Sequence, residues 1–247
     1  MAILEIEKLR KSFGGLMAID DINMKIQEHE VCSLIGPNGA GKTTLFNVIS
    51  GRFPPDRGTI VFRGREITGR APHKIVSMGL GRTFQITNIF PLLSTFENIE
   101  VAIIRNLNRS LRFFRPVRKY QEIQEETWQI LVELELTEKA EIIGGNLPYG
   151  DQRRLEIGIA LANKPRLLLL DEPTSGMSPE ETRSTVGLIE RLAKERKMTL
   201  LIIEHDMEVV FSISERVLVL HQGTLIAEGP PEEVSKNQEV ISAYLGE

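Results

Sequence analysis

The sequence predicts an α/β fold in which a mostly parallel sheet is interrupted by a mostly helical insert. Short apolar runs such as Val31–Ile35 and Leu167–Leu170 are typical of strands that are buried on both faces. Helical patterns separate most of these runs, and strands that are joined through helices pair in parallel. The insert is indicated between residues 86 and 162, where long polar–apolar helical stretches replace the short apolar runs.

Length and composition exclude several classes of protein. The 247 residues are enough to bury a substantial core, and 41% hydrophobic with 26% charged residues excludes disordered and fibrous chains. With 30 basic and 34 acidic residues the formal net charge is −4, so we expect no nucleic-acid binding through bulk charge. No apolar run approaches the ~18 residues of a membrane-spanning helix. The single cysteine, Cys32, excludes an internal disulfide framework.

The elements before the insert are predicted from alternation and from turn residues. Ile22, Met24 and Ile26 alternate with polar residues, which indicates a half-buried strand. The run that ends at Ile35 enters a glycine-rich turn, and the helix after this turn stops near Gly51. We therefore expect strands at 22–26, Val31–Ile35, Thr59–Phe62 and Leu80–Phe84, and a helix over Thr43–Ser50. Part of this β structure is expected to be antiparallel.

The insert and the second half of the core follow from the same signals. Ser178 can cap a helix that begins at Pro179, and Glu181 completes a capping box, so a helix starts there. We also expect helices over Lys119–Leu136 and Gln152–Ala162, and strands over Leu167–Leu170, Thr199–Glu204, Val217–Leu220 and Thr224–Ala227. This predicts an α/β core of residues 1–85 and 163–247, with a helical subdomain of residues 86–162.

A glycine-rich motif between the strand Val31–Ile35 and the next helix predicts a phosphate site. It matches G-x-x-x-x-G-K-[ST] and consists of Gly36, Pro37, Asn38, Gly39, Ala40, Gly41, Lys42, Thr43 and Thr44. Glycines let successive backbone N–H groups surround an anion, and the helix N-terminus adds its dipole. Lys42 can neutralise the β- and γ-phosphates, and the Thr43 hydroxyl can bind Mg²⁺. The strand–loop–helix context favours this P-loop over an ordinary glycine-rich turn.

Two acids directly after the strand Leu167–Leu170 are the natural partners of this loop. Ligands bind at the carboxyl ends of the strands in open α/β sheets, so Asp171 and Glu172 are expected near the phosphates. Asp171 can hold Mg²⁺, and Glu172 can polarise a water molecule for in-line attack on the γ-phosphate. The combination predicts a P-loop NTPase core.

The segment before Asp171 narrows the prediction to one family. Residues 147–156 read LPYGDQRRLE and lie where the ATP-binding subunits of ABC transporters carry their L-S-G-G-Q signature. The chain resembles these subunits over its whole length, with every motif in order. The resemblance implies that Phe13 stacks on adenine, that Gln85 is the glutamine of the Q-loop, that Ser175, Gly176, Met177 and Ser178 form the D-loop, and that His205 is the switch histidine.

The family also implies the cofactors, the catalytic roles and the partners. The cofactors are ATP and Mg²⁺, with Thr43, Gln85 and Asp171 at the metal, and catalysis falls to Glu172 and His205 together with Lys42. Two ATPase subunits, identical or homologous, would meet head to tail around two ATP molecules. The segment of one subunit that contains Leu147, Gly150, Asp151 and Gln152 would then face the γ-phosphate bound by the other. Transmembrane permease subunits, and indirectly a substrate-binding protein, would place the chain at the cytoplasmic face of the cell membrane.

The signature departs from the family pattern at three positions. Pro148 replaces the serine and Tyr149 replaces the first glycine, so a hydroxyl and one N–H group are lost. Asp151 replaces the glutamine and would repel a triphosphate unless its carboxylate turned away. Only Gly150 is carried over directly, and we expect a weaker closed dimer. The variant is similar to one found among branched-chain amino-acid importer ATPases.

Three further tracts are similar to the ATPases of branched-chain amino-acid importers. They are Gly79–Gln85, Ile89–Ile99 and Val240–Gly246. ATPases that serve urea, short amides or lipopolysaccharide share much of this pattern and remain alternatives. A soluble ABC ATPase is a further alternative, although translation types carry two ATP domains in one chain and DNA-repair types insert a long coiled coil. A plain P-loop kinase gives no reason for the signature segment.

The start of the insert is rich in basic residues and has two interpretations. The residues are Arg105, Arg109, Arg112, Arg115, Arg118 and Lys119, with Phe113 and Phe114 among them. They form either a solvated helix face with two core phenylalanines or a surface near lipid headgroups or a membrane subunit. Composition alone does not separate these interpretations.

Overall fold

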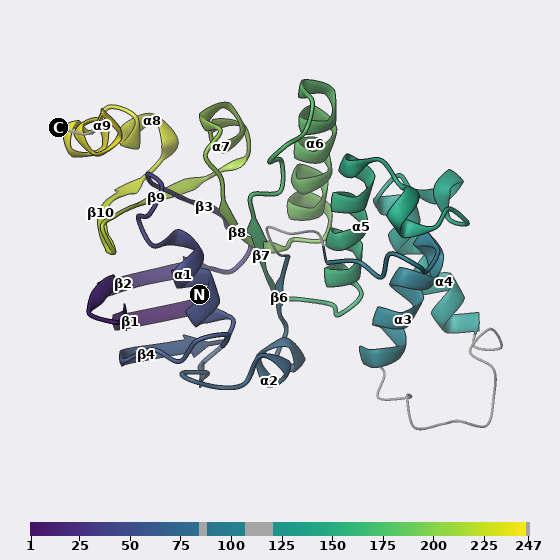
Figure 1. The fold of residues 1–247 in the computed structure, drawn as a ribbon, viewed down its shortest axis with the longest axis horizontal. Helices are drawn as coiled ribbons and strands as arrows, with labels where there is room; N and C mark the ends of the chain where they lie inside the picture. Colours follow the sequence, from purple (N-terminus) through teal and green to yellow (C-terminus); the bar gives the residue numbers. More distant parts are fainter. Residues whose placement is uncertain (84–87, 107–120, 246–247) are drawn as a thin grey trace.

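The computed structural model describes residues 1–83, 88–106 and 121–245. Gln85 and most of the basic stretch, from Arg109 to Lys119, lie outside the described residues. Two sheets and a group of helices make up the described chain, with the helices α3, α4 and α5 to one side of both sheets (Figure 1). The α/β fold with parallel and antiparallel parts is therefore confirmed. No helix in the described ranges is long and apolar enough to cross a membrane.

The first sheet is antiparallel and has the strand order β2-β1-β4-β5. Its strands are β1 (Ala2–Phe13), β2 (Leu16–Gln27), β4 (Arg57–Phe62) and β5 (Arg65–Glu66). Ile22, Met24 and Ile26 are buried, as the alternation in β2 predicts. Strand β1 was not predicted. Its register against β2 shifts at several points, so its buried positions do not keep a period of two.

The second sheet has six strands in the order β10-β9-β3-β8-β7-β6. They are β3 (Val31–Ile35), β6 (Leu80–Arg82), β7 (Leu167–Asp171), β8 (Thr199–Ile203), β9 (Arg216–His221) and β10 (Thr224–Gly229). All neighbours pair in parallel except β9 and β10. The ends of β3, β7 and β8 therefore meet at one edge, where the glycine-rich loop, Asp171 and His205 follow them.

Six helices accompany the two sheets. They are α1 (Lys42–Ile49), α2 (Pro72–Ser77), α6 (Pro179–Glu195), α7 (Met207–Ile213), α8 (Pro231–Val234) and α9 (Gln238–Leu245). Helix α6 starts as predicted, because Ser178 is its N-cap and forms the full capping box with Glu181. The helices α2, α7, α8 and α9 were not predicted, since each has eight residues or fewer and is too short to show a clear apolar period.

The helical side of the molecule contains α3 (Thr95–Asn106), α4 (Gln121–Glu133), α5 (Tyr149–Leu161) and two single turns, η3 (Thr137–Lys139) and η4 (Gly144–Asn146). Helix α5 begins three residues before the predicted Gln152, because Pro148 serves as its N-cap. Helix α4 ends before Leu136, where Glu135 takes a left-handed conformation with φ 58°. The subdomain boundaries at 86 and 162 stay a prediction.

The core has a large apolar cluster on each face of the parallel sheet. In β7, Leu167 and Leu169 belong to the cluster under β1 and β2, whereas Leu168 and Leu170 belong to the cluster under α5 and α6. All four are fully buried. Replacing any one with alanine is expected to cost about 2–5 kcal/mol of unfolding free energy. The strand that presents Asp171 is therefore held rigidly from both sides.

Candidate functional site

The glycine-rich loop between β3 and α1 has a backbone that only glycine tolerates at its ends. Gly36 has φ 150° and Gly41 has φ 107°. A Cβ atom would lie 2.0 Å from the Leu220 carbonyl oxygen at Gly36 and 2.4 Å from the Ala18 carbonyl oxygen at Gly41. The loop is therefore pressed against β9 and β2, with its tip around Asn38 turned outward.

Lys42 is the first residue of α1 and lies folded back into this loop. Its Nζ donates hydrogen bonds to the carbonyl oxygens of Gly36 (2.5 Å) and Pro37 (3.0 Å). Burial lowers the pKa of this ammonium, while the carboxylates of Glu172 and Asp171 raise it. No side chain caps α1 and no acid stands in its first turn. Its first N–H groups and the ammonium thus point to a site for an anion.

Asp171 ends β7 and is buried beside this loop, with 2% of its surface exposed. Its Oδ2 accepts a hydrogen bond of 2.9 Å from Arg82 Nη2, and its Oδ1 has no hydrogen-bond partner among the described residues. Burial raises the pKa of this carboxyl, and the bond to Arg82 opposes that effect. A buried carboxylate oxygen without a partner fits a hydrated divalent cation, so the donor set suits Mg²⁺.

Glu172 and His205 face each other across the ends of β7 and β8. Glu172 Oε1 lies 4.0 Å from His205 Nδ1. The Glu172 backbone has φ 50°, a left-handed conformation that is costly for this residue type and is typical of functional sites. A hydrogen bond of 2.9 Å from its N–H to the Ile203 carbonyl helps to hold this conformation. The His205 side chain is 60% exposed, so it is open to a ligand.

Glu204 is a buried residue of this site that our sequence analysis missed. It is fully buried, and its Oε1 accepts bonds from the Thr174 N–H (3.0 Å) and hydroxyl (2.6 Å). Its Oε2 accepts a bond of 3.2 Å from the His205 N–H. Glu204 thus ties the segment after Glu172 to His205. Its place at the carboxyl end of a parallel strand was the available signal.

The segment with the altered signature starts helix α5. Leu147 is buried, and its carbonyl accepts a bond of 2.9 Å from Gln152 Nε2. Asp151 Oδ2 accepts a bond from Lys139 Nζ, so its carboxylate is paired within the helical side of the molecule. The carboxylate is thus turned toward a lysine, which is the alternative to repelling a triphosphate that the sequence left open, and the lysine offsets its charge.

The residues expected to form the D-loop lie beside the start of α5. A Cβ atom at Gly150 would lie 2.9 Å from Glu181 Oε1, and Glu181 Oε2 accepts bonds from the Ser178 N–H (2.9 Å) and hydroxyl (2.8 Å). Gly176 has φ 77°, and the Met177 sulfur accepts a bond of 3.4 Å from Thr185. The Ser175 N–H donates to the Glu172 carbonyl at 3.2 Å. Residues 172–178 therefore connect the sheet edge that carries Asp171 and Glu172 to helix α5, which begins in the altered signature.

Comparison with known proteins identifies the family. The sequence profile described as "ABC transporter" matches residues 19–175, which is more than half of the chain. The chain belongs to the ABC transporter family. A second profile, "Branched-chain amino acid ATP-binding cassette transporter", matches residues 224–247 of this ABC ATPase.

Individual relatives of the ABC ATPase match it over nearly the full length. It is 45% identical to the high-affinity branched-chain amino acid transport ATP-binding protein BraF of Pseudomonas aeruginosa, over 99% of this chain and 98% of BraF. An ATP-binding cassette solved in its ADP conformation is 31% identical, with TM-score 0.87 and 100% of both chains covered. A dimeric cassette bound to ADP and Pi is 26% identical, with TM-score 0.78, over 92% of this chain and 98% of that one.

The aromatic residue expected at adenine ends β1 and is accessible in the ABC ATPase. Phe13 is 42% exposed, and its ring packs edge-on against Phe53 with centroids 5.3 Å apart. Lys11 Nζ lies 5.2 Å from the ring centroid. Phe13 pairs with Leu16, two residues from the Ala18 carbonyl that abuts the glycine-rich loop. Gln85, the expected metal ligand in the Q-loop, lies outside the described residues.

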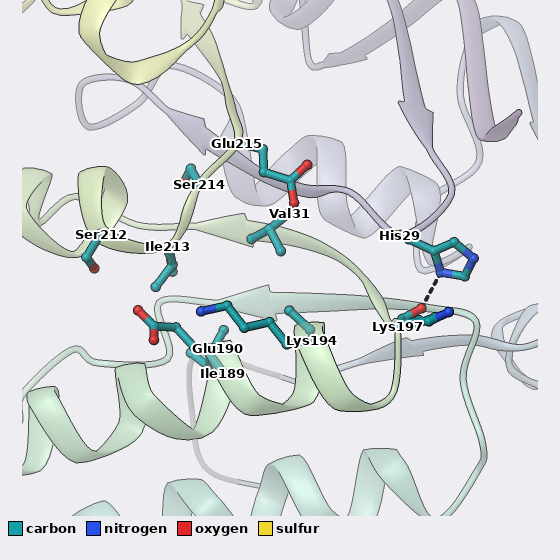
Figure 2. A pocket seen from close by; sticks show the side chains of 11 residues that line it. His29, Val31, Ile189, Glu190, Lys194, Lys197, Ser212, Ile213, Ser214 and Glu215 are labelled. Atoms are coloured by element: carbon teal, nitrogen blue, oxygen red, sulfur yellow. Dashed lines mark hydrogen bonds between the residues drawn. The ribbon is translucent and has the colours of Figure 1, made fainter.

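A pocket of about 520 Å³ lies far from this chemistry. Figure 2 shows it between α6 and the segment that joins α7 to β9, with Val31 at the start of β3 beside it. The glycine-rich loop follows Ile35 at the other end of the same strand. His29 Nδ1 is hydrogen-bonded to the Lys197 carbonyl at the pocket rim, as Figure 2 also shows. The candidate site around the glycine-rich loop lies instead at the opposite, carboxyl edge of the sheet.

Proposed function

We propose that this ABC ATPase couples ATP hydrolysis to the import of branched-chain amino acids. One observation carries the ATPase part: Lys42, Asp171 and Glu172 meet at one sheet edge, beside an uncapped helix N-terminus. The substrate class rests on the similarity to BraF, which extends through the C-terminal residues that the second profile matches.

The described residues fit ATP with Mg²⁺. The backbone N–H groups of residues 36–44 and the Lys42 ammonium bind the phosphates, and Phe13 stacks on the adenine. Thr43 and Asp171 would hold the metal, together with Gln85 from outside the described residues, and the metal would stabilise the negative charge on the phosphates during hydrolysis. Asp171 Oδ1, which has no hydrogen-bond partner in the part of the chain that the structure describes, supports this assignment.

Glu172 acts as the general base in this proposal. Its carboxylate accepts a proton from the water molecule that attacks the γ-phosphate in line, while Lys42 stabilises the phosphate oxygens. His205, held by Glu204 and 4.0 Å from Glu172, donates a hydrogen bond to the γ-phosphate and orients Glu172. The strained backbone of Glu172 fixes the direction in which its carboxylate points.

Partners complete the site. A second ATPase subunit, identical or homologous, presents the N-terminus of its α5 to the γ-phosphate, as supported by the dimeric relative. Permease subunits contact the segment that begins at Asn88, where Phe90 and Leu92 are 48% and 86% exposed. A substrate-binding protein acts through the permease, and the ATPase works at the cytoplasmic face of the membrane as a peripheral subunit.

Uptake by the assembled transporter tests this function. The chain, its permease subunits and its substrate-binding protein are reconstituted in vesicles, with ATP on the side of the ATPase. We expect ATP-dependent uptake of labelled leucine, isoleucine and valine, and no uptake with the Glu172→Gln chain. ATP-dependent uptake of urea or short amides without uptake of leucine would contradict the proposed substrate class. Absence of any ATP-dependent transport would favour a non-transport ABC ATPase.

A further inference from the structure

Arg82 connects the metal-binding aspartate to the helix that carries the phosphate loop. It ends β6, the strand next to β7 in the parallel sheet (Figure 1). Its Nη2 donates to Asp171 Oδ2 at 2.9 Å. Its Nη1 donates to Asn47 Oδ1 (2.9 Å) and Ser50 Oγ (2.8 Å), both at the C-terminal end of α1.

The contact between Arg82 and Asp171 is buried. The side chains of Arg82 and Asp171 are 5% and 2% exposed. The guanidinium also lies 5.6 Å from the centroid of the Phe46 ring. A planar guanidinium fixes the orientation of its partner, and an unpaired carboxylate at this depth is costly. The bond from Arg82 therefore restricts the orientation of the Asp171 carboxylate.

The two carboxylate oxygens of Asp171 therefore have different roles. Oδ2 is taken by Arg82, while Oδ1 is buried without a hydrogen-bond partner among the described residues. The Asp171 N–H is also engaged, with the Thr83 hydroxyl at 3.3 Å. A carboxylate held at one oxygen leaves the other in a single position, as for an oriented metal ligand.

We propose that Arg82 is a positioning residue for Mg²⁺ in the ATP site. It orients the Asp171 carboxylate for the metal. It also holds Asp171 in a fixed position relative to α1, whose first turn supplies Lys42 and Thr43. This inference rests on the proposed Mg-ATP function. Residues that orient a metal ligand typically contribute about 10- to 100-fold in metal affinity.

The test compares ATP binding with and without Mg²⁺ in purified Arg82→Met and wild-type protein. ATP affinity in EDTA is expected to stay within about twofold, because the phosphate loop is untouched, whereas the Mg²⁺ concentration for half-maximal tightening rises at least about 10-fold. Arg82→Lys keeps the charge and is expected to restore part of the effect. Arg65→Met is the matched control, since Arg65 is exposed in β5 at the far edge of the antiparallel sheet; it should behave as wild type.

Three results would overturn the proposal. The first is an unchanged Mg²⁺ requirement in Arg82→Met. The second is a lowered Mg²⁺ requirement, which would mean that Arg82 competes with the metal. The third is an equal loss of ATP affinity with and without Mg²⁺, which would mean that Arg82 has a structural role. If Arg82→Met does not fold, the Asn47→Ala/Ser50→Ala double variant decides, because it removes the anchors of Arg82 and leaves Asp171 intact. Failure of the wild-type chain to bind ATP would instead refute the proposed function.

Discussion

At the scale of single residues, burial and charge oppose each other at the ATP site. Lys42 is 8% exposed and is held by two carbonyl oxygens, and burial lowers its pKa. The direction follows from desolvation, which disfavours the charged form. Phosphate oxygens in place of the carbonyl oxygens would oppose the effect of burial on the Lys42 pKa, because they carry negative charge and would lie at the same distance.

Replacing Lys42 with alanine is expected to weaken ATP binding strongly. A charged hydrogen bond contributes about 1.5–3 kcal/mol, so the affinity should fall by about 10- to 100-fold, with loss of hydrolysis. Equilibrium titration with ATP measures this change. Lys236→Ala, on the exposed surface after α8, serves as the control. Affinity equal to wild type in Lys42→Ala would remove Lys42 from the phosphate site.

Glu172→Gln is expected to separate binding from chemistry. Glutamine keeps the size of the side chain and cannot accept the proton, so ATP affinity should be retained. The single-turnover hydrolysis rate should fall by about 10²- to 10⁴-fold. Paired titration and rapid-quench measurements on one preparation check both quantities. A parallel loss of affinity and rate would show that Glu172 has a structural role at its strained position.

At the scale of elements, the contact between η3 and α5 changes how the altered signature is interpreted. Asp151 was expected to repel the triphosphate unless its carboxylate turned away, and this carboxylate is bonded to Lys139 at the end of η3. The two positions are twelve residues apart, and the chain folds back through η4 to bring them together. The departure from the family glutamine is thus compensated locally.

Lys139→Met removes the partner of the Asp151 carboxylate, so we expect an uncompensated negative charge next to the γ-phosphate. Hydrolysis by the assembled transporter should slow by up to about fivefold, which corresponds to about 1 kcal/mol for a partly exposed ion pair. Adding Asp151→Asn to Lys139→Met should restore the rate, because the uncompensated charge disappears. Steady-state hydrolysis of the two variants and wild type checks this. A double variant as slow as Lys139→Met would rule out the electrostatic explanation.

At the scale of the whole molecule, association is expected to depend on the membrane subunits. Pro148 has neither the hydroxyl nor the N–H of the family serine, and each missing charge-assisted bond removes about 1.5–3 kcal/mol from a closed dimer. The isolated Glu172→Gln chain with Mg-ATP should therefore sediment mainly as a monomer, and tethering by the permease would supply the association. Pro148→Ser should raise the dimer fraction. A stable dimer of the Glu172→Gln chain at low micromolar concentration would contradict this prediction.

The contact with the permease is expected near Asn88 and Phe90. The exposed apolar side chains of Phe90 and Leu92 suit a protein partner. A cysteine at position 88 or 90 should crosslink to a permease subunit in the intact complex. Cys32 is fully buried, and burial raises the pKa of its thiol to about 12, so Cys32 is not expected to crosslink. The wild-type chain without an added cysteine is therefore the negative control. Crosslinking in no nucleotide state would place the interface elsewhere.

Local patterns in the sequence determined the strands β3, β7 and β8, the capped start of α6 and the glycine-rich loop. Each of these depends on residues close together in the chain: an apolar run, a capping box, or glycines at fixed spacing. The two acids at the end of β7 could be assigned to one edge because ligands bind at the carboxyl ends of the strands in open α/β sheets. The family resemblance supplied the expected places of the signature, the D-loop, the switch histidine and the aromatic residue for adenine, and these assignments stay predictions.

Only the tertiary structure decided which groups hold these residues in place. Arg82 and Asp171 are 89 positions apart, and Thr174 and Glu204 are 30 apart, so no local pattern links them. Strand β1 was missed because its register shifts against β2 break the period of two. The direction of the Asp151 carboxylate depended on Lys139, which a turn brings close. Side-chain pairing of this kind follows from packing, since a buried charge takes whichever partner the folded chain places beside it.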